Sequence, residues 1–201
     1  MGAKGIRTAR HIQGHLCTHI TYAAGAWASR ITKTDREKLA SMQRAALIVT
    51  TRAYNTVSGP ALLLIAGVPH IQQELERAQL TQKIRNNTPT VIGGIEYDPN
   101  STSGKELKER LKANQEVEHQ TRWQEDTRGR TTYEFFPTVK GRREAHWVTP
   151  SYYITQFLSG HGNFRAKLRK FSLVPSELCR CGQQDTSRHT FYECPVFEET
   201  R

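Results

Sequence analysis

The fold class is decided by residues 34–69, which read TDREKLASMQRAALIVTTRAYNTVSGPALLLIAGVP. The beginning of this stretch fits a capping box, in which the Thr34 hydroxyl and the Glu37 carboxylate each accept a hydrogen bond from an otherwise unpaired backbone N–H. Apolar residues then recur at three- and four-residue steps, the spacing of one stripe on an amphipathic helix. The stripe consists of Leu39, Met42, Ala46, Val49 and Ala53. The first half of the stretch therefore predicts a helix with one buried face.

Two more helices are predicted directly after this one. Ser58-Gly59-Pro60 begins a short apolar helix, and Gly67 and Pro69 end it, in the usual order of start and stop signals. A third helix is expected from about residue 71 to residue 84. Three connected helices with apolar stripes predict a mainly α fold.

The middle of the chain has a different composition. Residues 86–104 contain two prolines, three glycines and many small polar residues, which is typical of a linker. Ser103 and Glu106 then form a second capping box, which opens a charged helix that runs to about Trp123. The apolar content of this helix is low, so it is expected to be a solvated arm.

Beyond this helix the sequence predicts three short elements. Residues 131–139 have the composition of a strand, whereas 150–159 and 164–171 have that of helices. The sequence contains no internal repeat and no low-complexity tract.

The C-terminal tail carries a set of metal-ligating residues. It reads Leu178-Cys179-Arg180-Cys181-Gly182, followed by His189 and then by Cys194-Pro195. Three thiolates and one imidazole complete a tetrahedral zinc site with no position left for water, and such closed sites are structural rather than catalytic. Gly182 permits a tight turn that directs two sulfurs at one ion. The single residue between the first two cysteines is one fewer than usual.

Other interpretations of the cysteines and histidines stay open. The tail could hold three free cysteines and a surface histidine, but a reducing compartment favours a metal site over disulfides. His11, His15 and His19 recur at every fourth residue and could bind a metal or face phosphates. Because no carboxylate lies nearby to orient the rings, a polar helix face is the preferred interpretation. Cys17 has no evident partner.

The charge of the chain favours a polyanionic partner. The 201 residues include 29 lysines and arginines against 19 acidic residues, a net charge of +10. Such an excess raises the local concentration of nucleic acid and speeds encounter with it, with acidic proteins and membrane surfaces as alternatives. The longest apolar run, residues 61–68, is too short to span a bilayer, and residues 1–16 lack a secretory signal. We expect a protein of the nucleus and cytoplasm that is not secreted and has no membrane partner.

Aromatic and basic residues are interleaved ahead of the tail. Nine of the 17 aromatic residues lie between Trp123 and Phe164, with cations among them and just after them. Such rings can stack on the bases of a single strand while cations neutralise its phosphates. Equally, the rings could form the core and the cations its solvated surface. The candidate nucleic-acid-binding residues are Arg165, Lys167, Arg169, Lys170 and Arg180.

The sequence predicts no catalytic residue. Nucleotidyl transfer needs clustered carboxylates that hold two divalent ions about 3.5–4 Å apart. No two of the four aspartates are adjacent in the sequence. The chain also contains neither a GxxxxGK[ST] loop that cradles phosphates nor a GxSxG nucleophile elbow.

Several motifs together resemble a known family, the Pol polyproteins of non-LTR retrotransposons. The stretches similar to the region after the polymerase core are MQR at 42–44, YNTVS at 54–58, AL at 61–62 and AGVP at 66–69. TRGRTTYEFFP at 127–137 and FLSGHG at 157–162 narrow the resemblance to arthropod type-1 elements that insert into ribosomal RNA genes. The set Cys179, Cys181, His189 and Cys194 is similar to the CCHC knuckle near the end of those proteins.

The resemblance implies a C-terminal fragment of a polyprotein that has an N-terminal endonuclease and a central reverse transcriptase. Zn²⁺ would be structural in the knuckle, and Mg²⁺ would serve only the polymerase and endonuclease domains. The implied partners are element RNA, target ribosomal DNA and the rest of the polyprotein.

Under this interpretation the chain has four parts. They are a helical region after the reverse transcriptase core at 1–85, a linker at 86–104, a basic and aromatic connector at 105–171 and a CCHC zinc knuckle at 172–201. The expected role is non-catalytic binding of nucleic acid. Two alternatives stay open: a structural connector that packs the polymerase thumb, and a free-standing zinc adaptor protein.

Overall fold

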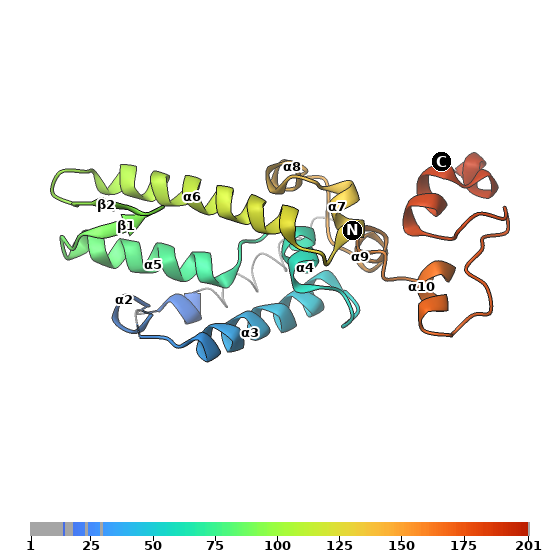
Figure 1. Cartoon of the computed structure of the whole chain (residues 1–201), viewed down its shortest axis with the longest axis horizontal. Helices are drawn as coiled ribbons and strands as arrows, with labels where there is room; N and C mark the ends of the chain where they lie inside the picture. Colours follow the sequence, from blue (N-terminus) through green and yellow to red (C-terminus); the bar gives the residue numbers. More distant parts are fainter. Residues whose placement is uncertain (1–13, 15–17, 23, 29, 201) are drawn as a thin grey trace.

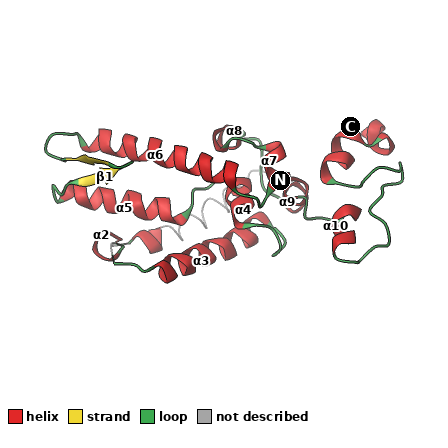
Figure 2. Ribbon diagram, viewed as in Figure 1, coloured by secondary structure: helices red, strands yellow, loops and turns green. Residues whose placement is uncertain are grey.

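The computed structural model describes residues 14, 18–22, 24–28 and 30–200, and it is mainly helical, as the sequence predicts (Figures 1 and 2). The elements, in chain order, are α2 (Ala24–Trp27), α3 (Lys33–Thr51), α4 (Gly59–Ala66), α5 (Ile71–Arg85), β1 (Thr90–Ile92), β2 (Ile95–Tyr97), α6 (Gly104–Glu125), α7 (Arg130–Phe135), α8 (Val139–Glu144), α9 (Tyr152–Ser159), α10 (Arg165–Lys170), the π-helix η1 (His189–Glu193) and the 3₁₀-helix η2 (Pro195–Thr200). None of the described helices is both long enough and apolar enough to cross a bilayer.

The three helices predicted first are present, but the start of α3 differs from the prediction. Its capping box lies two residues earlier, where the Asp35 N–H donates to the Thr32 hydroxyl at 3.2 Å and the Thr32 N–H donates to the Asp35 carboxylate at 3.1 Å. An acidic residue three positions after a threonine serves equally well in this frame. The end of α4 is as predicted, because Gly67 adopts the left-handed conformation that terminates a helix.

The predicted apolar stripe of α3 is wrong in part. Met42 and Val49 are exposed, at 52 % and 72 %, whereas Gln43, Leu47 and Thr51 form the buried face. Burial of the two polar residues is possible because both have partners in the backbone. The Thr51 hydroxyl donates to the Leu47 carbonyl at 2.7 Å. The buried stripe therefore runs at four-residue steps but is not purely apolar.

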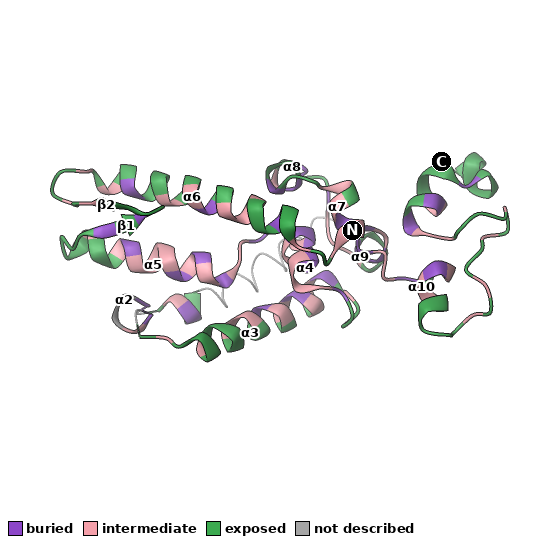
Figure 3. Ribbon diagram, viewed as in Figure 1, coloured by how far each residue is buried: buried purple, intermediate pink, exposed green. Residues whose placement is uncertain are grey.

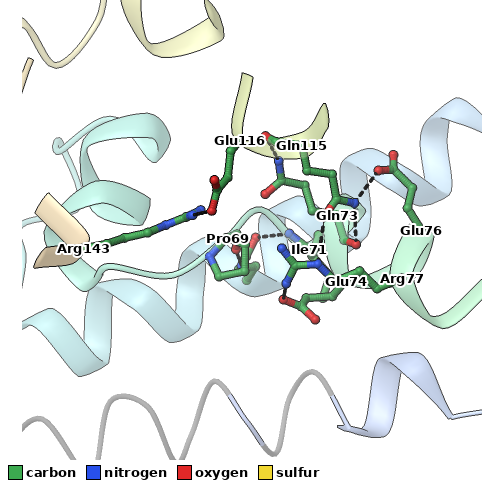
Figure 4. Close-up of polar contacts among 10 residues, drawn as sticks. Pro69, Ile71, Gln73, Glu74, Glu76, Arg77, Gln115, Glu116 and Arg143 are labelled. Atoms are coloured by element: carbon green, nitrogen blue, oxygen red, sulfur yellow. Dashed lines mark hydrogen bonds and ion pairs between the residues drawn. The ribbon is translucent and has the colours of Figure 1, made fainter. Parts of the chain in front are cut away.

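Gln43 joins the end of one helix to the start of another. Its side-chain NH₂ donates to the Pro69 carbonyl at 2.8 Å, and its side-chain carbonyl accepts from the Ile71 N–H at 2.9 Å. It thereby satisfies one of the N–H groups left unpaired at the first turn of α5. Figure 4 shows Pro69 and Ile71 at this junction.

We expect Gln43→Ala to lower the free energy of unfolding by about 1–3 kcal/mol, because one buried and one part-buried backbone group lose their partner. Urea unfolding measures the change. Met42→Ala is the matched control, because this neighbouring side chain is half exposed and its loss should cost only about 0.5 kcal/mol. Equal losses in the two variants would contradict the role assigned to Gln43.

The segment 86–104, expected to be a linker, contains a β-hairpin. β1 and β2 pair antiparallel with Thr90 opposite Tyr97, and the two residues between them are Gly93 and Gly94, both at positive φ. This is the two-residue turn that matches the twist of a hairpin. Ile92 is buried in a cluster with Leu80 of α5 and Leu107 of α6. The hairpin thus caps the end of the α5–α6 pair (Figure 1).

α6 packs against α5 and, at its C-terminal end, against α4 and α8, and it is not the solvated arm expected from the sequence. Leu107, Gln115 and Trp123 are buried. The side chains of Gln73 and Gln115 each donate to the other residue's backbone carbonyl, at 2.9 and 3.0 Å, and Gln115 also donates to Glu76 at 2.9 Å (Figure 4). Hydrogen-bonded amide side chains therefore hold α6 to α5 where apolar residues are few.

The strand expected at 131–139 is wrong, since these residues form α7 and the start of α8. The aromatic residues that suggested a strand serve to fill the core: Phe135 and Phe136 pack on the buried cluster that includes Ile65 and Leu158. The helices expected at 150–159 and 164–171 are confirmed as α9 and α10. The division of the chain into four parts stays a prediction.

A buried arginine lies where α4, α8 and the loop before α9 meet. The Arg142 side chain donates to the carbonyls of Ile65 at 2.6 Å, Val148 at 3.2 Å and Ala145 at 3.4 Å. The residue is only 5 % exposed. Figure 3 shows buried residues on α4 and on the helices around it, whereas most of the C-terminal tail is exposed.

Candidate metal centre

Two of the four predicted ligands lie on a tight turn at the start of the tail. Leu178 and Gln184 form an antiparallel bridge, and within it the Cys179 N–H donates to the Gln183 carbonyl at 2.7 Å. The Gly182 N–H donates back to the Cys179 carbonyl at 3.0 Å, and Gly182 has a φ of 87°. This positive φ favours glycine, as the sequence predicts. The turn brings the side chains of Cys179 and Cys181 to the same side.

The other two ligands mark the ends of η1. The Cys194 N–H donates to the His189 carbonyl at 2.8 Å, five residues back, which is the wide turn of a π-helix. The His189 N–H is held by the Thr186 hydroxyl at 3.1 Å. Both ligands are buried. This single wide turn is what returns Cys194 to the histidine.

The four side chains converge in space. All four ligand atoms lie within 4.8 Å of one another. The sulfurs of Cys179 and Cys194 are 3.6 Å apart, and the Cys181 sulfur is 3.1 Å from Nε2 of His189. A tetrahedral zinc ion with bonds of about 2.0–2.3 Å requires ligand separations of this order. The donor set therefore fits a metal ion and leaves no side open for substrate.

The electrostatics differ between two of the sulfurs, and only that of Cys179 favours the thiolate that binds a cation. The Cys181 backbone N–H donates to the Cys179 sulfur, and this bond, with the nearby His189, lowers the pKa of Cys179 to about 7. Burial instead raises the pKa of Cys194, although the Val196 N–H donates to its sulfur. Nε2 is the His189 nitrogen that faces the sulfurs, and the buried Nδ1 has no hydrogen-bond partner within the described part of the chain.

One aspartate, missed by the sequence analysis, attaches this centre to α10. The Asp185 carboxylate accepts from the Arg165 N–H at 3.0 Å and from the Thr190 hydroxyl at 2.8 Å, and its carbonyl accepts from the Ala166 N–H at 3.1 Å. It therefore supplies the cap that the helix does not find in its own preceding residue, Phe164. A helix start without a capping residue was the only signal in the sequence.

The five predicted nucleic-acid-binding cations fall into two groups. Arg165 and Lys167 are half-buried and engaged: Nε of Arg165 donates to the Ser176 carbonyl at 3.3 Å, and Nζ of Lys167 lies 3.0 Å from Nε2 of His161. The exposed group comprises Arg169, Lys170 and Arg180. The structure therefore brings two of the cations into the fold and leaves three in solvent.

His161, which the sequence analysis did not single out, links the tail to the helical body. Its Nδ1 lies 2.7 Å from the Thr56 hydroxyl, in the loop between α3 and α4. Burial, and secondarily the Lys167 ammonium, lowers the pKa of His161 to about 4, so the ring is neutral at pH 7. An ammonium group can only donate, so Nε2 accepts from Lys167 and Nδ1–H donates to Thr56.

The structure describes only one of the three N-terminal histidines that recur at every fourth residue. His11, His15 and Cys17 lie outside the described residues, and His19 is exposed. Among the described residues, the tail set is the one group of three or more histidines, cysteines or acidic residues with metal-binding geometry.

Comparison with known proteins finds similar proteins in type-1 retrotransposable elements. A Pol polyprotein from the type-1 retrotransposable element R1 4 of Nasonia vitripennis is 31 % identical over the whole chain, which spans 51 % of that protein. A Pol polyprotein from element R1 of Bradysia coprophila is 29 % identical over 90 % of the chain and 18 % of its own length. A putative 115 kDa protein in element R1DM of Drosophila melanogaster is 26 % identical over 94 % of the chain and 19 % of its own length.

The chain thus spans about half the length of the first of these relatives and about a fifth of the other two. No family model and no solved structure matches it. The matches nevertheless cover nearly all of the chain at 25–31 % identity, and they confirm the resemblance that its motifs indicate. The chain is a homologue of the Pol polyproteins of R1 type-1 retrotransposable elements.

Proposed function

We propose that this chain is the C-terminal, non-catalytic nucleic-acid-binding segment of a retrotransposon Pol polyprotein. The observation that carries the proposal is the Cys₃His donor set, which is tied through Asp185 to a helix that presents exposed cations. The set would hold one structural Zn²⁺. Mg²⁺ would serve only the polymerase and endonuclease domains of the parent protein.

The partners follow from this role. The parent would carry out RNA-directed DNA synthesis at a nicked chromosomal target, and this segment would hold element RNA or target ribosomal DNA beside the rest of the polyprotein. Such work would take place in the nucleus, after synthesis in the cytoplasm. The net charge of +10 supports a polyanionic partner.

A structural connector is the second candidate, and the His161 bridge favours it. Thr56, His161 and Lys167 form a continuous polar contact from the α3–α4 loop to α10. In that case the tail would pack the polymerase thumb, and its charge would be incidental. Salt dependence of nucleic-acid binding separates the two candidates.

The test uses the three exposed cations. Each phosphate contact on a single strand lowers log affinity by about 0.7 per unit of log salt, so Arg169→Ala, Lys170→Ala and Arg180→Ala combined should flatten the slope by about two units. Fluorescence anisotropy with a labelled single strand, repeated over a series of salt concentrations, measures it.

The control removes the same charge elsewhere. Lys33, Arg36 and Lys38 of α3 are exposed, and replacing all three with alanine should change the slope much less. If the two triple variants weakened binding equally, net charge alone would account for it and the local site would be wrong.

A further inference from the structure

The His161–Lys167 pair separates two cavities of opposite character. One lies between α7, the end of α9, α10 and the residues just before His189; the other lies between the α3–α4 loop, α10 and the residues that follow it. His161 and Lys167 line both cavities. The two spaces therefore adjoin across one ring and one ammonium group.

The first cavity is polar and cationic. It measures about 350 Å³ and is lined by Lys167, Lys170 and Arg188, of which Arg188 is paired with Glu193 at 3.1 Å, and by a single carboxylate, Glu134. Its other polar lining residues include four hydroxyl side chains, which can donate to an anion. They are Thr131, Ser159, Thr186 and Ser187. An excess of cations beside hydroxyl donors is suited to a phosphate group.

The second cavity is apolar and has aromatic walls. It measures about 420 Å³ and is lined by Tyr54, Leu168, Phe171 and Leu173, beside His161 and Lys167. Phe171 is 52 % exposed, and the Lys167 ammonium lies 5.5 Å from the centre of its ring. Two lining residues are held together at the end of α10, where the Leu173 N–H donates to the Leu168 carbonyl at 3.1 Å. A flat apolar group could stack here.

We propose that the two cavities together hold one nucleotide of a single-stranded nucleic acid, with its base against Phe171 and its phosphate between Lys167 and Lys170. The inference rests on the proposed function and names the site at which it operates. Only an unpaired strand offers a free base face next to a phosphate, whereas a duplex keeps its bases stacked. The cations of the first cavity suit the phosphate, and the Phe171 ring of the second cavity suits the base.

The test compares two labelled strands of about 12 nucleotides, a length within the range of single-strand sites. One is oligodeoxythymidine, and the other is an abasic strand with the same phosphates. The full chain should bind the thymidine strand about tenfold more tightly, a factor within the range expected for one stacked base. Fluorescence anisotropy at one fixed salt concentration measures both affinities.

Single variants separate the two cavities. Phe171→Ala should abolish the preference for the thymidine strand while leaving the salt slope unchanged, and Phe171→Trp should restore the preference. Lys170→Ala should weaken both strands equally and reduce the slope by about 0.7 units. Trp147→Ala is the control, because Trp147 is 80 % exposed and lines neither cavity, and it should keep the full preference.

The outcomes also distinguish this site from the broader function. If the unmodified chain bound both strands equally, or if Phe171→Ala kept the preference, the nucleotide site would be wrong while salt-dependent binding still supported the proposed function. If neither strand bound at low salt, both proposals would be wrong.

Discussion

Cys181→Ser is expected to release the metal ion and unfold the tail. The unmodified chain should carry about one zinc per molecule, because Cys179, Cys181, His189 and Cys194 complete a closed site. A serine hydroxyl does not replace a thiolate ligand. Zinc contributes about 10–16 kcal/mol to the folding of comparable small sites, so the tail should lose its structure with the ion.

The structure gives the physical reason for expecting the tail to depend on metal. Among the described residues 177–200 only Ser187, His189 and Cys194 are buried, and two of these three are candidate ligands. Phe191, Tyr192 and Phe197 remain 51 %, 63 % and 41 % exposed although Phe191 and Tyr192 contact Phe157, so only part of their apolar surface is removed from water. The hydrophobic contribution to the stability of the tail is correspondingly small.

Elemental analysis and amide hydrogen exchange measure the two effects. In Cys181→Ser, the N–H groups of Gly182 and Cys194, which close the two ligand turns, should exchange freely. Cys17→Ser is the control, since this cysteine is not one of the four ligands, and it should keep its zinc. A folded tail in zinc-free protein would contradict the prediction.

The second large effect is expected at Arg142. Arg142→Met keeps most of the side-chain volume but leaves the carbonyls of Ile65, Ala145 and Val148 without their charged donor. Hydrogen bonds from a charged group contribute about 1.5–3 kcal/mol, and we expect a total loss of about 3 kcal/mol in the free energy of unfolding. The cation also lies at the C-terminal end of α4, where the helix dipole favours positive charge.

Urea unfolding, followed by the fluorescence of the buried Trp123, measures this loss. Arg143→Met is the matched control: this neighbouring cation forms a partly exposed ion pair with Glu116 at 3.0 Å (Figure 4). Exposed pairs of this kind contribute about 0–1 kcal/mol. If the two variants were equally stable, the carbonyl contacts of Arg142 would not be important for stability.

Local signals in the sequence were sufficient for the positions of most helices. Ser58-Gly59-Pro60 and Gly67 delimit α4 as predicted, because start and stop residues act on neighbouring backbone. The buried face of α3 could not be predicted in the same way. Gln43 and Thr51 are buried through contacts with residues far along the chain: Gln43 with Pro69 and Ile71, and Thr51 with the Thr155 hydroxyl, which donates to the Thr51 carbonyl at 2.7 Å.

In two segments, the amino-acid composition predicted a different local structure from the one observed. Gly93 and Gly94 suggested a linker, but two glycines between short runs of apolar and β-branched residues are also the signature of a tight hairpin. At 131–139, aromatic composition suggested a strand. Burial of Phe135 and Phe136 against the core is the actual reason for their presence.

In the candidate site, too, some residues are indicated by local sequence signals and others only by contacts between distant parts of the chain. The four side chains that converge in the tail could be proposed as ligands from the sequence, because few residue types bind zinc and their spacing is short. Asp185 and His161 could not be identified in this way, since Asp185 caps a helix 20 residues earlier and His161 contacts a threonine 105 residues away. These partners follow from tertiary packing and leave no local pattern in the sequence.

The most direct test of a zinc-organised nucleic-acid-binding tail is the affinity for one labelled single strand before and after removal of metal by a chelator. Loss of the knuckle should separate Asp185 from α10 and disperse the exposed cations. We expect affinity at a fixed salt concentration to fall by about tenfold, equivalent to about 1.4 kcal/mol, and to return when zinc is restored. Metal-free protein that bound the strand with unchanged affinity and an unchanged salt slope would contradict this role for the tail.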